Sequence, residues 1–198
     1  MKQRPEWLTV PNALTLMRMV LMPFFGYFWW RHWFVLAIVT FAVASASDLV
    51  DGLLARVLDQ RSKLGQILDP AADKFMVLVT FVAAAATGAV PVWLAALVIG
   101  RDVVLASGGA LFAFVLRGRY PAAKWKPTRM GKYSTFAQVF TIFFALAMET
   151  TGAIATLQPY VAALGVTCAA LTIVSGTQYL AYGIKAAVSG TVPPGGTA

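Results

Sequence analysis

Long apolar segments, interrupted only by short polar turns, leave this chain few choices of fold. The segment from Trp33 to Ala46 contains no charged residue at all. Across the 198 residues, 59% are hydrophobic and 12% are charged, whereas about a quarter of the residues are charged in a soluble domain. Several segments approach or exceed the roughly 20 apolar residues that a helix needs to cross a bilayer. We therefore expect an all-α integral membrane protein.

Turn residues divide the apolar segments into six expected transmembrane helices. Their expected ranges are 12–30, 33–58, 63–87, 92–116, 129–150 and 159–188. Together they form one membrane domain over residues 1–188, and the Gly- and Pro-rich residues 189–198 are expected to be a disordered tail. The first apolar run lacks a small-residue cleavage site, so we expect a retained helix rather than a cleaved signal peptide.

The distribution of basic residues predicts how the six helices are oriented. Basic residues gather before the first helix, around the second connection and around the fourth, which holds Arg117, Arg119, Lys124, Lys126, Arg129 and Lys132. The opposite connections hold only Arg31 and His32. The positive-inside rule therefore places both termini in the cytoplasm. We expect a bacterial cytoplasmic membrane protein whose net charge of +8 faces anionic lipids rather than nucleic acid.

Four aspartates lie on the second and third expected helices, near their cytoplasmic ends: Asp48, Asp51, Asp69 and Asp73. Four residues of the second helix share one face, because they are spaced i, i+3, i+4 and i+7: Asp48, Asp51, Gly52 and Ala55. On the third, a shared face holds Gly65, Asp69 and Asp73, provided that the helix continues with a kink through Pro70. The alternative starts that helix at Pro70, with Asp69 as its N-cap. We prefer the continuous helix because it aligns all three residues.

The four carboxylates are expected to converge, because a short connection makes the second and third helices antiparallel neighbours. Without a cation among them, buried carboxylates would repel one another and cost several kcal/mol. An all-oxygen ligand set favours a hard divalent cation, Mg²⁺ or Mn²⁺. For any single aspartate, contact with water or with an arginine is the alternative. Small residues on the same faces leave room for a bulky ligand.

The stretch Asp48-x2-Asp51-Gly52-x2-Ala55-Arg56-x8-Gly65-x3-Asp69-x3-Asp73 resembles the signature of the CDP-alcohol phosphatidyltransferase family. All eight specified positions are matched, which makes the likeness specific. The six-helix layout extends the likeness over nearly the whole chain.

This resemblance implies a catalytic site and a donor substrate. Two divalent cations, held by Asp48, Asp51 and Asp69 with a contribution from Asp73, would grip the pyrophosphate of CDP-diacylglycerol. Asp73 would also be the general base that deprotonates the acceptor hydroxyl, so that CMP leaves. Nucleotide binding would involve Gly52, Ala55, Arg56 and Gly65, with Arg56 holding a phosphate. The family habit also implies a homodimer among the membrane lipids.

Five basic residues are candidates for binding the acceptor or its phosphate: Arg18, Arg101, Lys126, Arg129 and Lys132. Arg18 and Arg101 lie inside expected membrane helices, where a charge is costly and usually functional. The alternatives are snorkelling of Arg18 to the headgroups and a structural pairing of Arg101 with another helix. The remaining three lie in or next to a connection that the positive-inside rule makes basic in any case.

Three further runs bear on the acceptor: "PNALTLMR", "GRDVVL" and "KPTRMGKYSTFAQ". They resemble the cardiolipin synthase branch of the family, whose acceptor is phosphatidylglycerol. The close alternative is the phosphatidylglycerophosphate synthase branch, whose acceptor is glycerol 3-phosphate and which shares the first run and "LDPAADK". An ion transporter is the remote alternative, and the chain lacks the inverted repeat that is typical of transporters.

Overall fold

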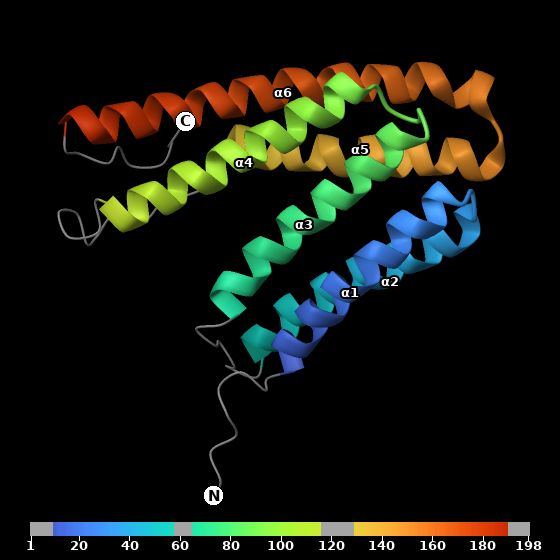
Figure 1. Cartoon of the computed structure of the whole chain (residues 1–198), viewed down its shortest axis with the longest axis horizontal. Helices are drawn as coiled ribbons and strands as arrows, with labels where there is room; N and C mark the ends of the chain where they lie inside the picture. The colour runs from blue at the N-terminus through green and yellow to red at the C-terminus, as the bar shows by residue number, and fades with distance from the viewer. Residues whose placement is uncertain (1–9, 58–64, 116–128, 190–198) are drawn as a thin grey trace, which may run out of the picture. The chain divides into compact units, whose positions relative to one another are not determined.

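The computed structural model describes residues 10–57, 65–115 and 129–189. These residues form six α-helices and no strand (Figure 1): α1 Val10–Trp30, α2 Phe34–Val57, α3 Gly65–Ala86, α4 Val92–Val115, α5 Arg129–Thr151 and α6 Ile154–Ser189. The all-α class and the order of the helices confirm the prediction. The observed ends lie within two residues of the predicted ones, except at the start of α6.

The start of α6 lies five residues before the predicted one, at Ile154 rather than at Pro159. The prediction used Pro159 as the first helical residue, but the helix forms around it. Proline lacks the backbone N–H that would bond to Ala155, so the helix loses one hydrogen bond in its second turn. The preceding turn is made by Gly152, whose φ of 64° glycine adopts at little cost.

Helix α3 runs without a break from Gly65 to Ala86 and contains Pro70. This confirms the predicted continuous helix and excludes the alternative in which Asp69 caps a helix that starts at Pro70. Because residues spaced by four share a helical face, Asp69 and Asp73 lie one turn apart on the same side of α3.

The described helices group into two compact units, and α1, α2 and α3 belong to the first. Within this unit α1 packs closely against both α2 and α3. The site on α3 therefore has α1 as a wall. The predicted direct pairing of α2 with α3 would involve residues outside the described part of the chain and stays a prediction.

The buried stripe of α1 changes character along the helix. Its second half is apolar, with Met22, Phe25 and Trp29 fully buried. The indole Nε1–H of Trp29 donates a hydrogen bond of 2.9 Å to Thr87 Oγ1, just past the end of α3. The first half of the same stripe is polar and equally buried: Asn12, Thr15 and Arg18. Polar groups buried on an apolar helix need partners, and they lie at the end of the unit where α3 begins.

The second unit contains α4, most of α5, and α6. Helix α4 packs along α6 (Figure 1), and Gly165 lets the two approach, since a Cβ there would lie 3.2 Å from Leu94 Cδ2. Helix α5 contacts α6 through a buried hydrogen bond of 3.2 Å between the hydroxyls of Ser134 and Thr172. Within the described residues, one stretch is long and apolar enough to cross a membrane, Ile154–Ala181, with a mean hydropathy of 1.7. The six-span topology stays a prediction.

Candidate active site

Two of the four predicted acids have described side chains, and both lie on the first turns of α3. Asp69 and Asp73 are exposed, whereas Ala72 between them is buried and fixes the rotation of the helix. The pair therefore presents two carboxylates on one accessible face. Its ligand set is all oxygen, which fits a hard divalent cation such as Mg²⁺ or Mn²⁺.

Asp69 is held by α1. The hydroxyl of Thr15 donates a hydrogen bond of 3.0 Å to Asp69 Oδ1. Thr15 has no exposed surface, so its hydroxyl position is fixed by the packing of α1 on its neighbours. A hydrogen bond from such a fixed donor orients the Asp69 carboxylate, and so sets the direction in which its free oxygen lone pairs point.

Asp73 is held by α1 as well, through an ion pair. The guanidinium Nη1 of Arg18 lies 2.7 Å from Asp73 Oδ1. The two members differ in exposure, because the Arg18 side chain is 1% exposed and the Asp73 side chain is 61% exposed. The buried cation thus reaches the site from inside the unit, while the carboxylate stays open to a substrate.

This contact bears on the two readings of Arg18. Snorkelling to the headgroups would leave the guanidinium at the surface, but the side chain is buried within the first unit. An acidic partner inside the protein is the usual fate of a charge in an apolar helix. Binding of an acceptor phosphate by Arg18 stays a prediction.

The remaining predicted site residues are only partly described. The backbone of α2 is described as far as Val57, but its side chains are not described from residue 48 onward. This undescribed set includes Asp48, Asp51, Gly52, Ala55 and Arg56. Gly65 is buried at the start of α3. Lys126 and the side chain of Arg129 also lie outside the described part, and Lys132 is exposed on α5. Among the side chains that are described, no three His, Cys, Asp or Glu residues form a metal-binding group. The convergence of four carboxylates therefore stays a prediction.

Arg101 lies in the second unit and pairs within its own helix. Its Nη1 lies 2.6 Å from Asp102 Oδ1, and its Nη2 donates a hydrogen bond of 3.2 Å to Ser175 Oγ of α6. The predicted alternative was a structural pairing with another helix. The structure shows a contact with another helix, because Ser175 of α6 accepts a hydrogen bond from Arg101. The acidic partner, Asp102, is instead the next residue of α4 itself.

Sequence reasoning missed a buried polar network that joins α5 to α6. Gln138 Nε2 donates to Ser134 Oγ at 3.4 Å, and the Ser134 hydroxyl bonds to that of Thr172. Ser175, which accepts from Arg101, donates to the carbonyl of Thr172 at 3.2 Å. The available signal was spacing: Ser134 and Gln138 are four residues apart, and Thr172 and Ser175 are three apart, each pair on one face of an apolar helix.

Thr15 was missed for a different reason. It stood in the quoted run "PNALTLMR" and follows Asn12 by three and precedes Arg18 by three, which is the spacing of one helical face. That periodicity marks a polar stripe on an apolar helix. It does not identify the acids that the stripe contacts, because they lie more than fifty residues away in the chain.

The described chain is thus an all-α protein of apolar helices with an exposed pair of carboxylates held from a neighbouring helix. Its sequence assigns it further: the chain belongs to the CDP-alcohol phosphatidyltransferase family, whose model matches residues 8–175. The match includes the two described carboxylates and the polar stripe of α1.

Curated relatives carry two different names. The human cardiolipin synthase (CMP-forming) is 34% identical over 155 residues, which cover 70% of this chain and 50% of the human protein. The Streptomyces coelicolor cardiolipin synthase (CMP-forming) is 31% identical, covering 78% of this chain and 73% of that protein. The Cereibacter sphaeroides CDP-diacylglycerol–glycerol-3-phosphate 3-phosphatidyltransferase is 35% identical, covering 68% and 61%. The chain spans about half the length of the fly and human relatives, 49% and 50%.

Proposed function

We propose that this protein transfers a phosphatidyl group from CDP-diacylglycerol to a hydroxyl of phosphatidylglycerol, giving cardiolipin and CMP. The observation that carries the proposal is the exposed pair of carboxylates on α3, Asp69 and Asp73, each fixed by a buried side chain of α1. Both belong to a family signature whose every position is present in this chain.

The donor side of the reaction uses the acidic residues of α2 and α3. Asp48, Asp51 and Asp69, with Asp73, would hold two divalent cations, Mg²⁺ or Mn²⁺, against the pyrophosphate. When bound, such cations neutralise charge that develops on the leaving phosphate. Thr15 keeps Asp69 oriented for this task. The nucleotide would be held by Gly52, Ala55, Arg56 and Gly65.

The acceptor side uses Asp73 as a general base. Asp73 takes the proton of the acceptor hydroxyl while that oxygen forms a bond to the phosphorus attached to the diacylglycerol. The bond from this phosphorus to the CMP oxygen breaks, and CMP leaves. Arg18 fixes Asp73 Oδ1 through a charge-assisted contact of 2.7 Å, and the 61% exposure of the Asp73 side chain lets an acceptor reach it.

The choice of acceptor is supported by sequence likeness. Relatives named cardiolipin synthase come from fly, human and Streptomyces, and the three runs that include Arg18, Arg101 and Lys132 resemble that branch. Relatives named for glycerol 3-phosphate match at similar identity. Glycerol 3-phosphate is therefore the alternative acceptor, and the basic candidates Arg18, Arg101, Lys126, Arg129 and Lys132 would serve either one.

We also infer that the protein lies in the bacterial cytoplasmic membrane, crosses it six times and has both termini in the cytoplasm. We further infer that it forms a homodimer. Support comes from α6, which contains a stretch suited to cross a membrane, and from α1. Helix α1 buries its polar stripe but exposes large apolar side chains on other faces: Leu16, Val20 and Phe24. Outward apolar and inward polar groups are what a hydrocarbon environment requires.

An acceptor panel tests the proposal. Purified protein with radiolabelled CDP-diacylglycerol and Mg²⁺ or Mn²⁺ receives one alcohol at a time, and lipid products are separated by chromatography. Phosphatidylglycerol is expected to give labelled cardiolipin and stoichiometric CMP, and excess chelator is expected to stop the reaction. Consumption of glycerol 3-phosphate without use of phosphatidylglycerol would instead assign the alternative acceptor.

A further inference from the structure

The turn between α1 and α2 carries exposed aromatic side chains beside two basic residues, Arg31 and His32, which are exposed as well. Three rings at the turn face outward in large part: Trp30 is 63% exposed, Trp33 47% and Tyr27 46%. Tryptophan and tyrosine combine an apolar ring with a polar N–H or O–H, and they gather where a membrane meets water. The composition of this surface is therefore that of a membrane interface.

The rings at the turn hold one another in place. Trp33 stacks on Phe28 with the ring centroids 6.0 Å apart, and it meets Tyr27 edge-on at 6.2 Å. The guanidinium carbon of Arg31 lies 5.7 Å from the centroid of the Trp33 ring, which is the range of a cation–π contact. The packed ring therefore positions the guanidinium without neutralising its charge.

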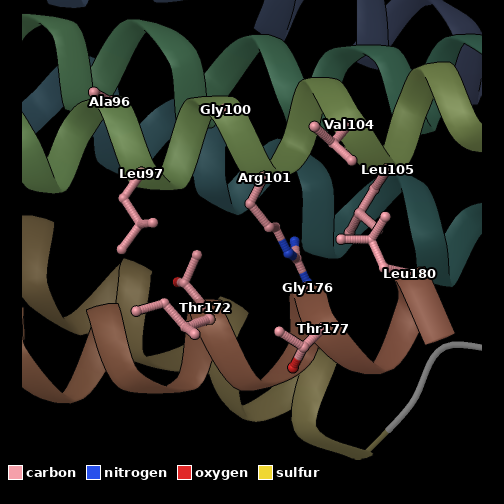
Figure 2. A pocket seen from close by; sticks show the side chains of 11 residues that line it. Ala96, Leu97, Gly100, Arg101, Val104, Leu105, Thr172, Gly176, Thr177 and Leu180 are labelled. Atoms are coloured by element: carbon pink, nitrogen blue, oxygen red, sulfur yellow. The ribbon is translucent and has the colours of Figure 1, made fainter.

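Arg31 differs in this respect from the other arginines whose side chains the structure describes. Arg18 pairs with Asp73, and Arg101 pairs with Asp102. Figure 2 shows the Arg101 side chain reaching from α4 toward α6 rather than outward. Among the described residues, Arg31 forms an ion pair with no acid. An anion from the surroundings is therefore the suitable counter-charge for this exposed cation.

The turn lies at the end of α1 that is remote from the acids of α3. Arg31 follows Arg18 by thirteen residues, which is roughly 20 Å along the helix axis. Helix α1 has 21 residues, so its length of roughly 31 Å matches the roughly 30 Å of a hydrocarbon core. With the acids near one face of the bilayer, the turn lies at the other face. This membrane setting rests on the proposed function.

We propose that the turn between α1 and α2 binds the phosphate group of a membrane phospholipid, in the leaflet opposite the acids. Arg31 supplies the cation, and the rings of Trp30 and Trp33 lie at the level of the glycerol esters. Lipids of net negative charge are favoured, because the surface is cationic. A second copy of the chain is the less suitable occupant, since a two-fold contact through this turn would bring two such cations together. The lipid is not a substrate, because it lies at the other end of α1 from the acids.

Photolabelling in phosphatidylcholine nanodiscs tests the contact. One probe is phosphatidylethanolamine with a diazirine on its amine, which makes the lipid anionic. The other is phosphatidylcholine with a diazirine at the end of an acyl chain. Labelled peptides are identified by mass spectrometry. The headgroup probe is expected to label residues 27–34, and the chain probe is expected to label residues 38–43 instead. Labelling of residues 27–34 by the chain probe alone would refute the interfacial position.

Charge variants test the role of Arg31. Arg31→Gln is expected to reduce labelling of residues 27–34 by the headgroup probe about fivefold, the effect of one basic residue near an anionic surface. Arg31→Lys keeps the charge and is expected to keep the labelling. Lys132→Gln is the matched control, because it removes an exposed cation from α5. An equal reduction in Arg31→Gln and Lys132→Gln, or no reduction in either, would remove the phosphate contact from the proposal.

The depth of the rings has its own measurement. Phosphatidylcholine brominated near its ester groups or near its methyl ends quenches tryptophan fluorescence at the depth of the bromine. The signal of the two turn tryptophans is the difference between wild type and the double variant Trp30→Phe/Trp33→Phe. This signal is expected to be quenched more strongly by bromine near the esters. Stronger quenching by bromine near the methyl ends would contradict the proposal.

These measurements read binding rather than turnover, so they separate this inference from the proposed function. A protein that makes no cardiolipin still shows whether residues 27–34 are labelled. An active protein without this labelling would refute the lipid site and leave the proposed function standing. Absence of labelling by both probes, together with disulfide-linked dimers of Arg31→Cys, would assign the turn to contact with a second copy of the chain.

Discussion

Arg18 and Asp73 form an ion pair whose members lie in different surroundings. The cation is enclosed by the first unit, and the carboxylate is largely exposed. Loss of the carboxylate charge therefore acts on chemistry at the surface, whereas loss of the arginine also removes packing inside. The two ends of the pair can be tested separately for this reason.

The first prediction concerns the carboxylate. Asp73→Asn keeps an oxygen that accepts from Arg18 but cannot take a proton from the acceptor. Turnover is expected to fall by about 10² to 10⁴, the usual contribution of a general base, while CDP-diacylglycerol still binds. Rates are measured with labelled donor, and binding by equilibrium retention of the donor on the purified variant. A variant with wild-type turnover would make Asp73 structural.

The second prediction concerns the cation. Arg18→Met keeps an apolar stem of similar length in the buried stripe and removes the charge beside Asp73. Turnover is expected to fall about tenfold or more, because the carboxylate loses its orienting partner, with little change in KM for the donor. Arg31→Met provides the control, since Arg31 is an exposed cation that lies 5.7 Å from the Trp33 ring and far from Asp73 in the chain.

An equal loss of turnover in Arg18→Met and Arg31→Met would show that Arg18 acts through the net charge of the protein and not through its contact with Asp73. The thermal unfolding temperature of Arg18→Met, compared with that of Arg18→Ala, checks that the stripe is still packed. A large drop in the Ala variant alone is the expected result of lost packing.

At the scale of helices, α1 is the element that aligns the acids of α3. Thr15 and Arg18 are three residues apart on α1, and their partners Asp69 and Asp73 are four apart on α3. Two contacts about one helical turn apart fix both the rotation and the axial position of one helix against the other.

The third prediction follows from this alignment. Thr15→Val preserves shape but removes the hydroxyl that holds Asp69. The Mg²⁺ or Mn²⁺ concentration for half-maximal activity is expected to rise roughly tenfold, in the range found when a residue that orients a metal ligand is removed. Thr40→Val is the matched control, because the Thr40 hydroxyl donates to the carbonyl of Leu36 in its own helix at 2.7 Å. An unchanged metal requirement in Thr15→Val would separate Asp69 from metal binding.

The elements were more predictable than their contacts. Apolar runs bounded by Gly and Pro indicate where helices lie, and α4 starts at the predicted residue, directly after Pro91, for this reason. The face of α3 was also predictable, because helical periodicity is local. The partners of Asp69 and Asp73 were not, since Thr15 and Arg18 meet them only through tertiary packing. Pro159 misled because it was taken as the first helical residue, whereas α6 begins at Ile154 and forms around the proline with the loss of one backbone hydrogen bond.

For the molecule as a whole, the family model matches residues 8–175, which include parts of both compact units. Both units therefore belong to the family's domain. Orientation in the membrane was inferred from basic residues alone, which report on membrane insertion rather than on packing. It requires a test that does not depend on the fold.

The fourth prediction supplies that test. Pro91, before α4, and Lys132, in α5, are both exposed, and the native Cys168 is buried. In intact bacterial cells, a membrane-impermeant maleimide is expected to label Pro91→Cys, whereas Lys132→Cys is labelled only after the membrane is opened. Labelling is read from the shift of the purified protein on a gel. The reverse pattern would invert the predicted topology.

The hydrogen bond between Trp29 and Thr87 lies at the far end of the same helix that holds the acids. Trp29 follows Thr15 by fourteen residues, which is roughly 21 Å along the axis. Helix α1 therefore contacts the α3 segment through polar side chains near both of its ends. We expect that a shift of α1 at Trp29 also displaces Thr15 and Arg18, and with them the two carboxylates that they hold. Defects in turnover can thus originate in residues that never meet a substrate, and a screen limited to the acidic motif would overlook them.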